Sequence, residues 1–237
     1  MKWPNRKDST LDALSKYLGE WQKLNAWWEH SGEPDAPHVI LSAGDHSTVF
    51  MNNGVIAQQD APLFLKMMRD LVGQHPSLIW GEDLAEVDFI VAPAMGGVQM
   101  AIVLALAIHS MHGIKVAQYY SEKIEDPVTK KVIGMKFTRG GPQKGQRGLV
   151  FDDVTTSLNA LLLCAKAVTD ADAEVIGLGS ILNRSPFETV GIGGKKLPIH
   201  CLVRKDIRNH KPEECPLCQA GSKAFRPKEL WSELTKR

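Results

Sequence analysis

The sequence predicts an α/β fold in which a mostly parallel sheet is flanked by helices. From Val87 onwards, apolar stretches of strand length alternate with longer stretches that have helical periodicity. Strands that alternate with helices are joined by right-handed crossovers, and such crossovers produce parallel sheets. The strand interiors are almost continuously apolar, as expected when helices cover both faces of a sheet. The chain has 237 residues, of which 43% are hydrophobic, so it can bury the core of one large domain.

The N-terminal region, residues 1–85, is expected to form a helix and a hood of short strands. Residues 9–30 predict a helix, because Ser9 and Asp12 resemble a capping box and the apolar residues after them have helical spacing. We expect the tryptophans of this helix to serve packing or a subunit contact. Its apolar positions are Leu11, Leu14, Leu18, Trp21 and Trp28.

The rest of this region predicts two short strands and a second helix. The strands lie in residues 38–54 and are separated by a polar turn at residues 44–47. The helix has Asp60 as its N-cap and Pro62 in its first turn, and Gly73 is expected to end it. Its buried face is predicted to contain Leu63, Phe64, Met67 and Leu71.

The core region, residues 86–210, contains the alternating elements. A strand and a tight turn are predicted at residues 87–97, followed by strands at 115–120, 148–153, 174–182 and 197–203. Helices are predicted at residues 98–113 and 157–171. Residues 211–237 form a tail that contains a CxxC pair, and we expect one structural domain overall.

Residues 121–146 form a long polar excursion between two of the predicted strands. The segment is rich in charges and glycines and has no helix signal. Such excursions inside compact folds are usually functional or mobile. Its second half, VIGMKFTR, predicts either a β-ribbon arm that closes over a site or an ordinary solvated hairpin.

Two adjacent acids, Asp152 and Asp153, stand at the carboxyl end of a predicted buried strand, where parallel sheets bind ligands. Thr155, Thr156 and Ser157 follow them and begin a helix, whose free N–H groups and hydroxyls can hold a phosphate. A sugar phosphate has complementary groups, because its diol donates to carboxylates and its phosphate accepts from amides. The alternative is an ordinary acidic strand end before a helix that begins with hydroxyl residues.

The segment FDDVTTSLN resembles the phosphoribosyl-pyrophosphate (PRPP) motif of type I phosphoribosyltransferases, and other segments resemble the orotate branch of that family in the same order. HVILSAGDHSTVFMN is similar to the branch's N-terminal strand–turn–strand, VAPAMGGVQMAIVLA to its pyrophosphate loop, and YYSEK with GMKFTRGG to its mobile loop. LNRS is similar to the segment that carries the orotate-contacting arginine. The resemblance extends from about His38 to Pro227.

The resemblance implies a role for each matching residue. Lys123, Asp152, Asp153 and Arg139 are the expected catalytic residues, and Thr156 and Arg184 are expected to bind the base. An arginine can hold the carboxylate of orotate with two parallel hydrogen bonds. The PRPP-binding residues are expected to be Ser42, Ala94, Met95, Gly96, Gly97, Lys123, Asp152, Asp153, Val154, Thr155, Thr156, Ser157, Leu158 and Asn159.

The implied reaction transfers the 5-phosphoribosyl group of PRPP to orotate, which gives orotidine 5′-phosphate and pyrophosphate in pyrimidine nucleotide biosynthesis. Mg²⁺ is the expected cofactor, because it can bridge the oxygens of the anionic leaving group. The resemblance also implies a homodimer with shared active sites. A phosphoribosyltransferase for another nucleobase and a PRPP-binding regulatory protein without turnover are the alternatives.

The chain departs from the family pattern in the phosphate turn. Aligned without a gap, Leu158 stands where the family has glycine, and Asn159 stands where it has serine or threonine. Glycine permits a positive φ and a close backbone approach, and leucine disfavours both. Three explanations remain open: a reshaped turn, weaker phosphate binding, or a deletion of one residue that shifts the roles of Ser157 and Leu158.

Several other classes of site are disfavoured. The formal charge of +1 and the lack of a polybasic run argue against nucleic-acid or membrane-surface binding. No apolar run approaches about 20 residues and the N-terminus lacks a secretory signal pattern, so we expect a cytoplasmic protein.

Cys215 and Cys218 are half of a zinc site at best, with His200, Cys201 and His210 as possible further ligands. The sequence favours a tight turn without metal there.

Overall fold

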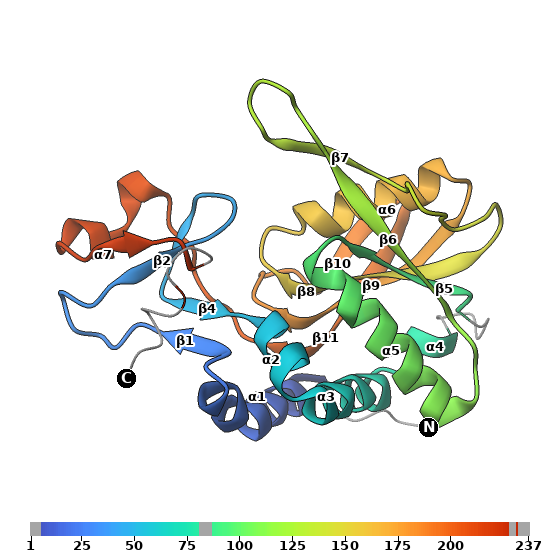
Figure 1. Cartoon of the computed structure of the whole chain (residues 1–237), viewed down its shortest axis with the longest axis horizontal. Coiled ribbons are helices and arrows are strands. Elements are labelled where there is room, and N and C mark those ends of the chain that lie inside the picture. The colour runs from blue at the N-terminus through green and yellow to red at the C-terminus, as the bar shows by residue number, and fades with distance from the viewer. Residues whose placement is uncertain (1–5, 81–86, 228–230, 232–237) are drawn as a thin grey trace. The chain divides into compact units, whose positions relative to one another are not determined.

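The structure is a computed structural model that describes residues 6–80, 87–227 and Trp231. For residues 6–12 and 80 it describes the backbone and not the side chains. The chain forms two compact units (Figure 1). The core unit consists of residues 1–14 and 60–205, and the small unit consists of residues 15–59 and 206–237. These units begin or resume at residues 15, 60 and 206, whereas the sequence suggested boundaries at 86 and 211. The expectation of a single structural domain stays a prediction.

A seven-stranded sheet forms the centre of the core unit. Its strand order is β10-β11-β9-β8-β5-β6-β7. The five strands from β11 to β6 are mutually parallel, and antiparallel β10 and β7 close the two edges. The predicted α/β fold with a mostly parallel sheet is therefore confirmed. The strands are β5 (Phe89–Pro93), β6 (Ala117–Glu125), β7 (Val132–Lys136), β8 (Arg147–Thr155), β9 (Glu174–Asn183), β10 (Thr189–Ile192) and β11 (Lys195–Arg204).

Helices cover both faces of this sheet, with α3 and α5 on one side and α6 on the other (Figure 1). Phe89 and Val91 of β5 belong to the same apolar cluster as α6, whereas Gly97 of α5 packs against Ala92. This alternation is expected, because consecutive strand residues point to opposite faces. The helices of the core unit are α3 (Ala61–Gln74), α4 (Ser77–Trp80), α5 (Gly96–His112) and α6 (Asn159–Asp170).

The helix α3 follows the sequence prediction except at its end. Asp60 is the N-cap and accepts a hydrogen bond from the backbone N–H of Leu63 at 2.9 Å. Gly73 does not end the helix, which continues to Gln74 and is capped by the backbone of His75. Leu63 is only half-buried. The buried face instead consists of Phe64, Met67, Met68, Leu71 and Val72.

The polar excursion between β6 and β8 contains an antiparallel hairpin, which is compatible with both sequence readings. Strands β6 and β7 pair with Glu122 opposite Lys136 and Lys123 opposite Met135. The turn at the tip is held by Asp126, which accepts hydrogen bonds from the backbone and the hydroxyl of Thr129. In Figure 1 the hairpin extends away from the rest of the core unit.

The small unit is built from both ends of the chain. Helix α1 (Arg6–Lys23) begins in the core unit and ends in the small unit, and the remaining elements are short. They are β1 (Trp27–Glu29), β2 (His38–Ile40), β3 (His46–Ser47), β4 (Val49–Met51), α2 (Asn53–Gln59), the 3-10 helix Pro212–Glu214, α7 (Pro216–Gln219) and β12 (Ala224–Phe225). Strand β1 pairs with β4, and β2 lies between β12 and β3.

The first helix is shorter than predicted. It ends at Lys23, and Asn25 turns the chain with φ +53°. Trp28 therefore lies in strand β1 and not on the helix. Trp21 does pack, since its ring stacks between those of Tyr17 and Trp27. In the part of the chain that the structure describes, no helix has the length and apolarity needed to span a membrane.

Candidate active site at the carboxyl edge of the sheet

The two predicted acids lie near the carboxyl end of β8, which continues as far as Thr155. Each carboxylate accepts a hydrogen bond from the next backbone N–H. Asp153 N–H donates to Asp152 Oδ1 at 2.9 Å, and Val154 N–H donates to Asp153 Oδ1 at 2.7 Å. Both side chains are half-buried. A carboxylate can accept several hydrogen bonds, so the pair could also accept from a ligand.

The charges of this pair are closely linked. Burial, followed by the negative charge of Asp153, raises the pKa of Asp152 to about 8. The positive charge of Lys123 on β6 opposes this rise, so that lysine lies within electrostatic range of the pair. The rise means that the pair resists carrying two negative charges at neutral pH.

The predicted pyrophosphate loop lies beside Asp153. The peptide bond between Ala94 and Met95 is cis, and the Ala94 N–H donates to the carbonyl oxygen of Ser121 at 2.8 Å. A methyl group added to Gly96 would lie 3.4 Å from Asp153 Oδ2. A methyl group on Gly97 would lie 2.7 Å from the Ala92 side chain and would clash with it. Gly97 thus lets the start of α5 approach strand β5, whereas a methyl group on Gly96 would lie beside Asp153 in ordinary van der Waals contact.

The predicted phosphate turn has a left-handed residue at its end. Leu158 caps α6 with φ 62° and ψ −8°, which is the conformation that glycine adopts most easily. Its side chain is 6% exposed and belongs to the apolar cluster between α6 and the sheet. Thr155 is also buried, and its hydroxyl has no hydrogen-bond partner among the described residues. Ser157 and Asn159 are exposed at the same turn, and Thr156 is half-buried.

The predicted base-binding residues, Thr156 and Arg184, directly follow two neighbouring strands, β8 and β9. Thr155 pairs with Asn183 in the β8–β9 ladder, and Arg184 N–H donates to the carbonyl oxygen of Thr155 at 2.9 Å. Arg184 therefore lies at the same edge as Thr156. Its side chain is 3% exposed, although an arginine after a strand is more often at the surface. Burial lowers the pKa of Arg184 to about 10, so the guanidinium still carries its charge at neutral pH.

The turn that holds Arg184 contains a network that the sequence did not reveal. The backbone N–H and the hydroxyl of Ser185 both donate to Asn183 Oδ1, at 2.9 and 2.7 Å. The amide of Asn183 donates to the carbonyl oxygen of Phe187 at 3.0 Å. Asn183 and Ser185 flank Arg184 in the motif LNRS, which was the available signal.

Three further predicted site residues, Lys123, Arg139 and Ser42, are all exposed. Lys123 and Arg139 are exposed, the first on β6 and the second in the segment after β7. Ser42 is exposed in the turn between β2 and β3, which belongs to the small unit. The core unit thus brings together the acidic pair, the glycine loop, the phosphate turn and Arg184. The roles of these residues stay predictions.

Comparison with known proteins places the chain among named relatives. No family profile matches the sequence. The orotate phosphoribosyltransferase of Caldanaerobacter subterraneus subsp. tengcongensis is 30% identical over 198 residues, which cover 80% of this chain and 87% of the relative. The orotate phosphoribosyltransferase of Thermotoga maritima is 30% identical over 204 residues, which cover 84% of this chain and 94% of the relative.

Solved structures agree with the fold. The crystal structure of orotate phosphoribosyltransferase from Aeropyrum pernix matches with a TM-score of 0.55 and 19% identity, covering 79% of this chain and 93% of that one. The enzyme of the same name from Francisella tularensis matches with a TM-score of 0.52 and 13% identity, covering 80% and 85%. With the sequence relatives, these matches lead to one conclusion: the chain belongs to the orotate phosphoribosyltransferase family.

Proposed function

We propose that this protein transfers the 5-phosphoribosyl group of PRPP to orotate and releases orotidine 5′-phosphate and pyrophosphate, a step of pyrimidine nucleotide biosynthesis. Family membership supports the reaction class. The observation that carries the choice of base is the buried, charged Arg184 beside the phosphate turn. A guanidinium presents two parallel N–H donors that match the geometry of a carboxylate, and orotate carries a carboxylate.

The remaining groups suit the sugar and the leaving group. Asp152 and Asp153 would accept hydrogen bonds from the ribose hydroxyls, and the amides of the turn before α6 would bind the 5-phosphate. The backbone of residues 94–97 would bind the pyrophosphate. Departure of pyrophosphate leaves positive charge on the sugar, as in glycoside hydrolysis, and the adjacent carboxylates stabilise that charge. No protein nucleophile is required.

We expect the reaction to depend on Mg²⁺, and the residues present fit this ion. Two carboxylates and the oxygens of PRPP form a set of hard oxygen donors, which Mg²⁺ prefers. Bound there, the ion would neutralise the leaving pyrophosphate. Asp152 and Asp153 would hold it through the ribose hydroxyls and water, so the role of the chain is to orient the substrate.

A sequence of two measurements tests the proposal. Isothermal titration with PRPP and Mg²⁺ should detect one binding site per chain, and an absorbance assay should then follow the consumption of orotate. Binding without turnover of any base would point to a regulatory protein. Turnover of a purine in place of orotate would point to another nucleobase enzyme.

Variants of Arg184 separate base recognition from PRPP binding. Arg184→Ala should raise the KM for orotate by about 10-fold or more, because one charge-assisted contact contributes about 1.5–3 kcal/mol. The KM for PRPP should change much less. Arg184→Lys is the matched control, since it keeps the charge and loses the bidentate geometry, and it should recover only part of the affinity. Equal losses for both substrates would contradict the assignment.

A homodimer is part of the proposal. Helix α5 exposes Ile102 and Leu106, which are 40% and 56% exposed. These residues are four positions apart and so lie on one face of the helix. A second copy of the chain would cover this face, as the resemblance to the family implies.

A further inference from the structure

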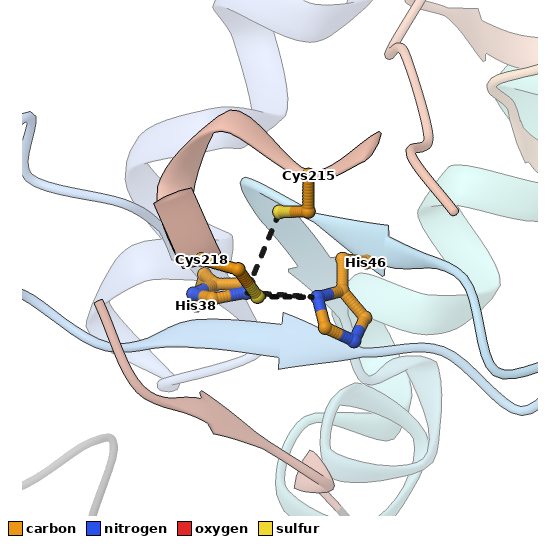
Figure 2. A group of neighbouring side chains, drawn as sticks. All are labelled: His38, His46, Cys215 and Cys218. Carbon is orange, nitrogen blue, oxygen red and sulfur yellow. Dashed lines mark hydrogen bonds between the residues drawn. The ribbon is translucent and has the colours of Figure 1, made fainter. Parts of the chain in front are cut away.

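Four side chains with metal-binding atoms meet inside the small unit (Figure 2). His38 comes from β2 and His46 from β3, whereas Cys215 and Cys218 come from the start and the body of α7. One ligand atom from each residue lies within 4.8 Å of the others. This cluster differs from the set suggested by the sequence. His200 and Cys201 lie on β11 of the core unit, and His210 pairs with His46 through backbone hydrogen bonds without being one of the four residues.

Four of the six distances between these atoms are close to the edge lengths of a tetrahedral site. Zinc bonds to nitrogen and sulfur would place the ligand atoms about 3.3–3.8 Å apart. His38 Nε2 lies 3.0 Å from His46 Nδ1, 3.4 Å from Cys218 Sγ and 3.6 Å from Cys215 Sγ. His46 Nδ1 lies 3.2 Å from Cys218 Sγ. An ion could therefore enter with only small movements of the side chains.

A hydrogen-bond chain fixes the tautomer of His38. The hydroxyl of Ser222 donates to the carbonyl oxygen of Ala36 at 2.5 Å, and this carbonyl can only accept. Ser222 Oγ must then accept from His38 Nδ1, which lies 2.7 Å away. The proton of His38 is thus on Nδ1, and the lone pair of Nε2 points at the two thiols and His46. Support of this kind behind a histidine is typical of metal ligands.

The backbone around the two cysteines also suits a metal. Cys215 is the N-cap of α7 and Cys218 lies within the helix, and both sulfurs approach His38 Nε2. Gly221 follows with φ +92°, and the N–H of Ser222 donates to the carbonyl oxygen of Leu217 at 2.9 Å. This turn brings Ser222 back against His38. The same residues therefore build both the thiol pair and the support for the imidazole.

From this geometry we infer that His38, His46, Cys215 and Cys218 bind one structural zinc ion. Two thiolates and two imidazoles form the donor set that zinc prefers in structural sites. Four protein ligands leave no open position for a substrate. Three of the four side chains are buried, with His38 0%, His46 6% and Cys215 1% exposed.

The ion would join two segments that are far apart in the sequence. His38 is separated from Cys215 by 177 positions, and the strands of this region have only two or three residues. Strand β12 pairs with β2, which places Ala224 opposite His38. So few ladder hydrogen bonds give little stability on their own, and a metal that closes a long loop adds to it.

Metal analysis of the full-length protein tests the inference without any use of transferase activity. Protein from zinc-supplemented medium, after gel filtration, should contain about one zinc per chain by mass spectrometry. Replacement by Co²⁺ should give visible absorption typical of a tetrahedral ion and a thiolate charge-transfer band in the near ultraviolet. A metal-free protein that also gives no such spectrum with Co²⁺ would overturn the inference.

Paired variants identify the ligands. Cys215→Ser, Cys218→Ser and His46→Asn should each lose the metal, whereas the controls His210→Asn and Cys201→Ala should keep it. Zinc retained at full stoichiometry by Cys215→Ser/Cys218→Ser would overturn the assignment. If a ligand variant fails to fold, removal of zinc from the unaltered protein by a chelator should make residues 206–227 sensitive to protease, and re-addition should restore protection. Equal cleavage with and without zinc would contradict a structural role.

Discussion

Asp152 illustrates how one residue links stability to the proposed chemistry. Its pKa is raised to about 8 by burial and by Asp153, whereas an aspartate in the unfolded chain titrates near 4. Between these pH values the folded protein holds one proton more than the unfolded chain. Stability therefore falls as the pH rises from about 4 to about 8 and then levels off. The negative charge on Asp152, which would orient the ribose, therefore lowers the free energy of unfolding of the protein without substrate.

We predict that Asp152→Asn stabilises the ligand-free protein and abolishes most of its activity. The gain in the free energy of unfolding should be small near pH 4 and should grow up to about pH 8, as measured by urea unfolding at several pH values. Asp126→Asn is a control in which the change in stability should have the opposite sign. Hydrogen bonds from Thr129 and Val128 lower the pKa of Asp126, so its negative charge stabilises the folded protein. A gain for Asp152→Asn that is equal at all pH values would contradict the role of burial.

Leu158 has a left-handed backbone conformation, which glycine adopts most easily. The three explanations for its departure from the family pattern stay predictions. A non-glycine residue in this region costs about 1–2 kcal/mol. Burial of the leucine side chain contributes about 1.5–3 kcal/mol and offsets that cost.

This balance predicts an unusual order of stability at position 158. Both Leu158→Ala and Leu158→Gly remove the buried side chain, but only glycine also removes the backbone strain. Leu158→Gly should therefore be the more stable of the two by about 1 kcal/mol, the reverse of the usual order in a helix. Urea unfolding midpoints of the two variants provide the measurement. A more stable alanine variant would mean that position 158 is not strained.

At the scale of the element, the β6–β7 hairpin carries the candidate lysine. Lys123 is exposed on β6 and is electrostatically linked to Asp152. Lys123→Ala should lower kcat by at least about 10-fold through the loss of a cation beside the leaving pyrophosphate. Its melting temperature should stay within about 1–2 °C of the parent, since exposed substitutions have small effects on stability.

Lys131→Ala is the matched control for this hairpin. It removes the same charge from an exposed position at the tip, beside the turn of Asp126, and should leave kcat nearly unchanged. Unfolding of the Lys123 variant would assign a structural role to that lysine. Equal losses of activity in the two variants would mean that only the total charge of the hairpin matters.

The elements that the sequence predicted well are those with local signals. The apolar strands, the Asp60 cap and the acidic strand end each depend on residues close in sequence. Helix α1 was overextended, because Trp28 continues its apolar spacing although the turn at Asn25 ends it. The burial of Arg184 depends on the β8–β9 register, which no local pattern specifies. The same holds for His38 and His46, whose partners lie near the other end of the chain.

At the scale of the whole molecule, the proposed homodimer predicts complementation between inactive variants. If Lys123 of one subunit serves the site of the other, a hybrid of Lys123→Ala and Asp153→Asn subunits contains one intact site. Mixing the two inactive proteins under exchange conditions should then restore about a quarter of the parent activity. Light scattering should show two chains per particle. A dimer without restored activity would assign the hairpin to its own subunit.

The discontinuous small unit has a consequence for biosynthesis. Residues 60–205 of the core unit leave the ribosome before residues 206–237, which the small unit requires. The sheet can therefore assemble while His38 and His46 still await Cys215 and Cys218. Closure of so long a loop is slow compared with local folding. During translation, strands β2 and β3 are exposed to chaperones and proteases until residues 206–237 are made.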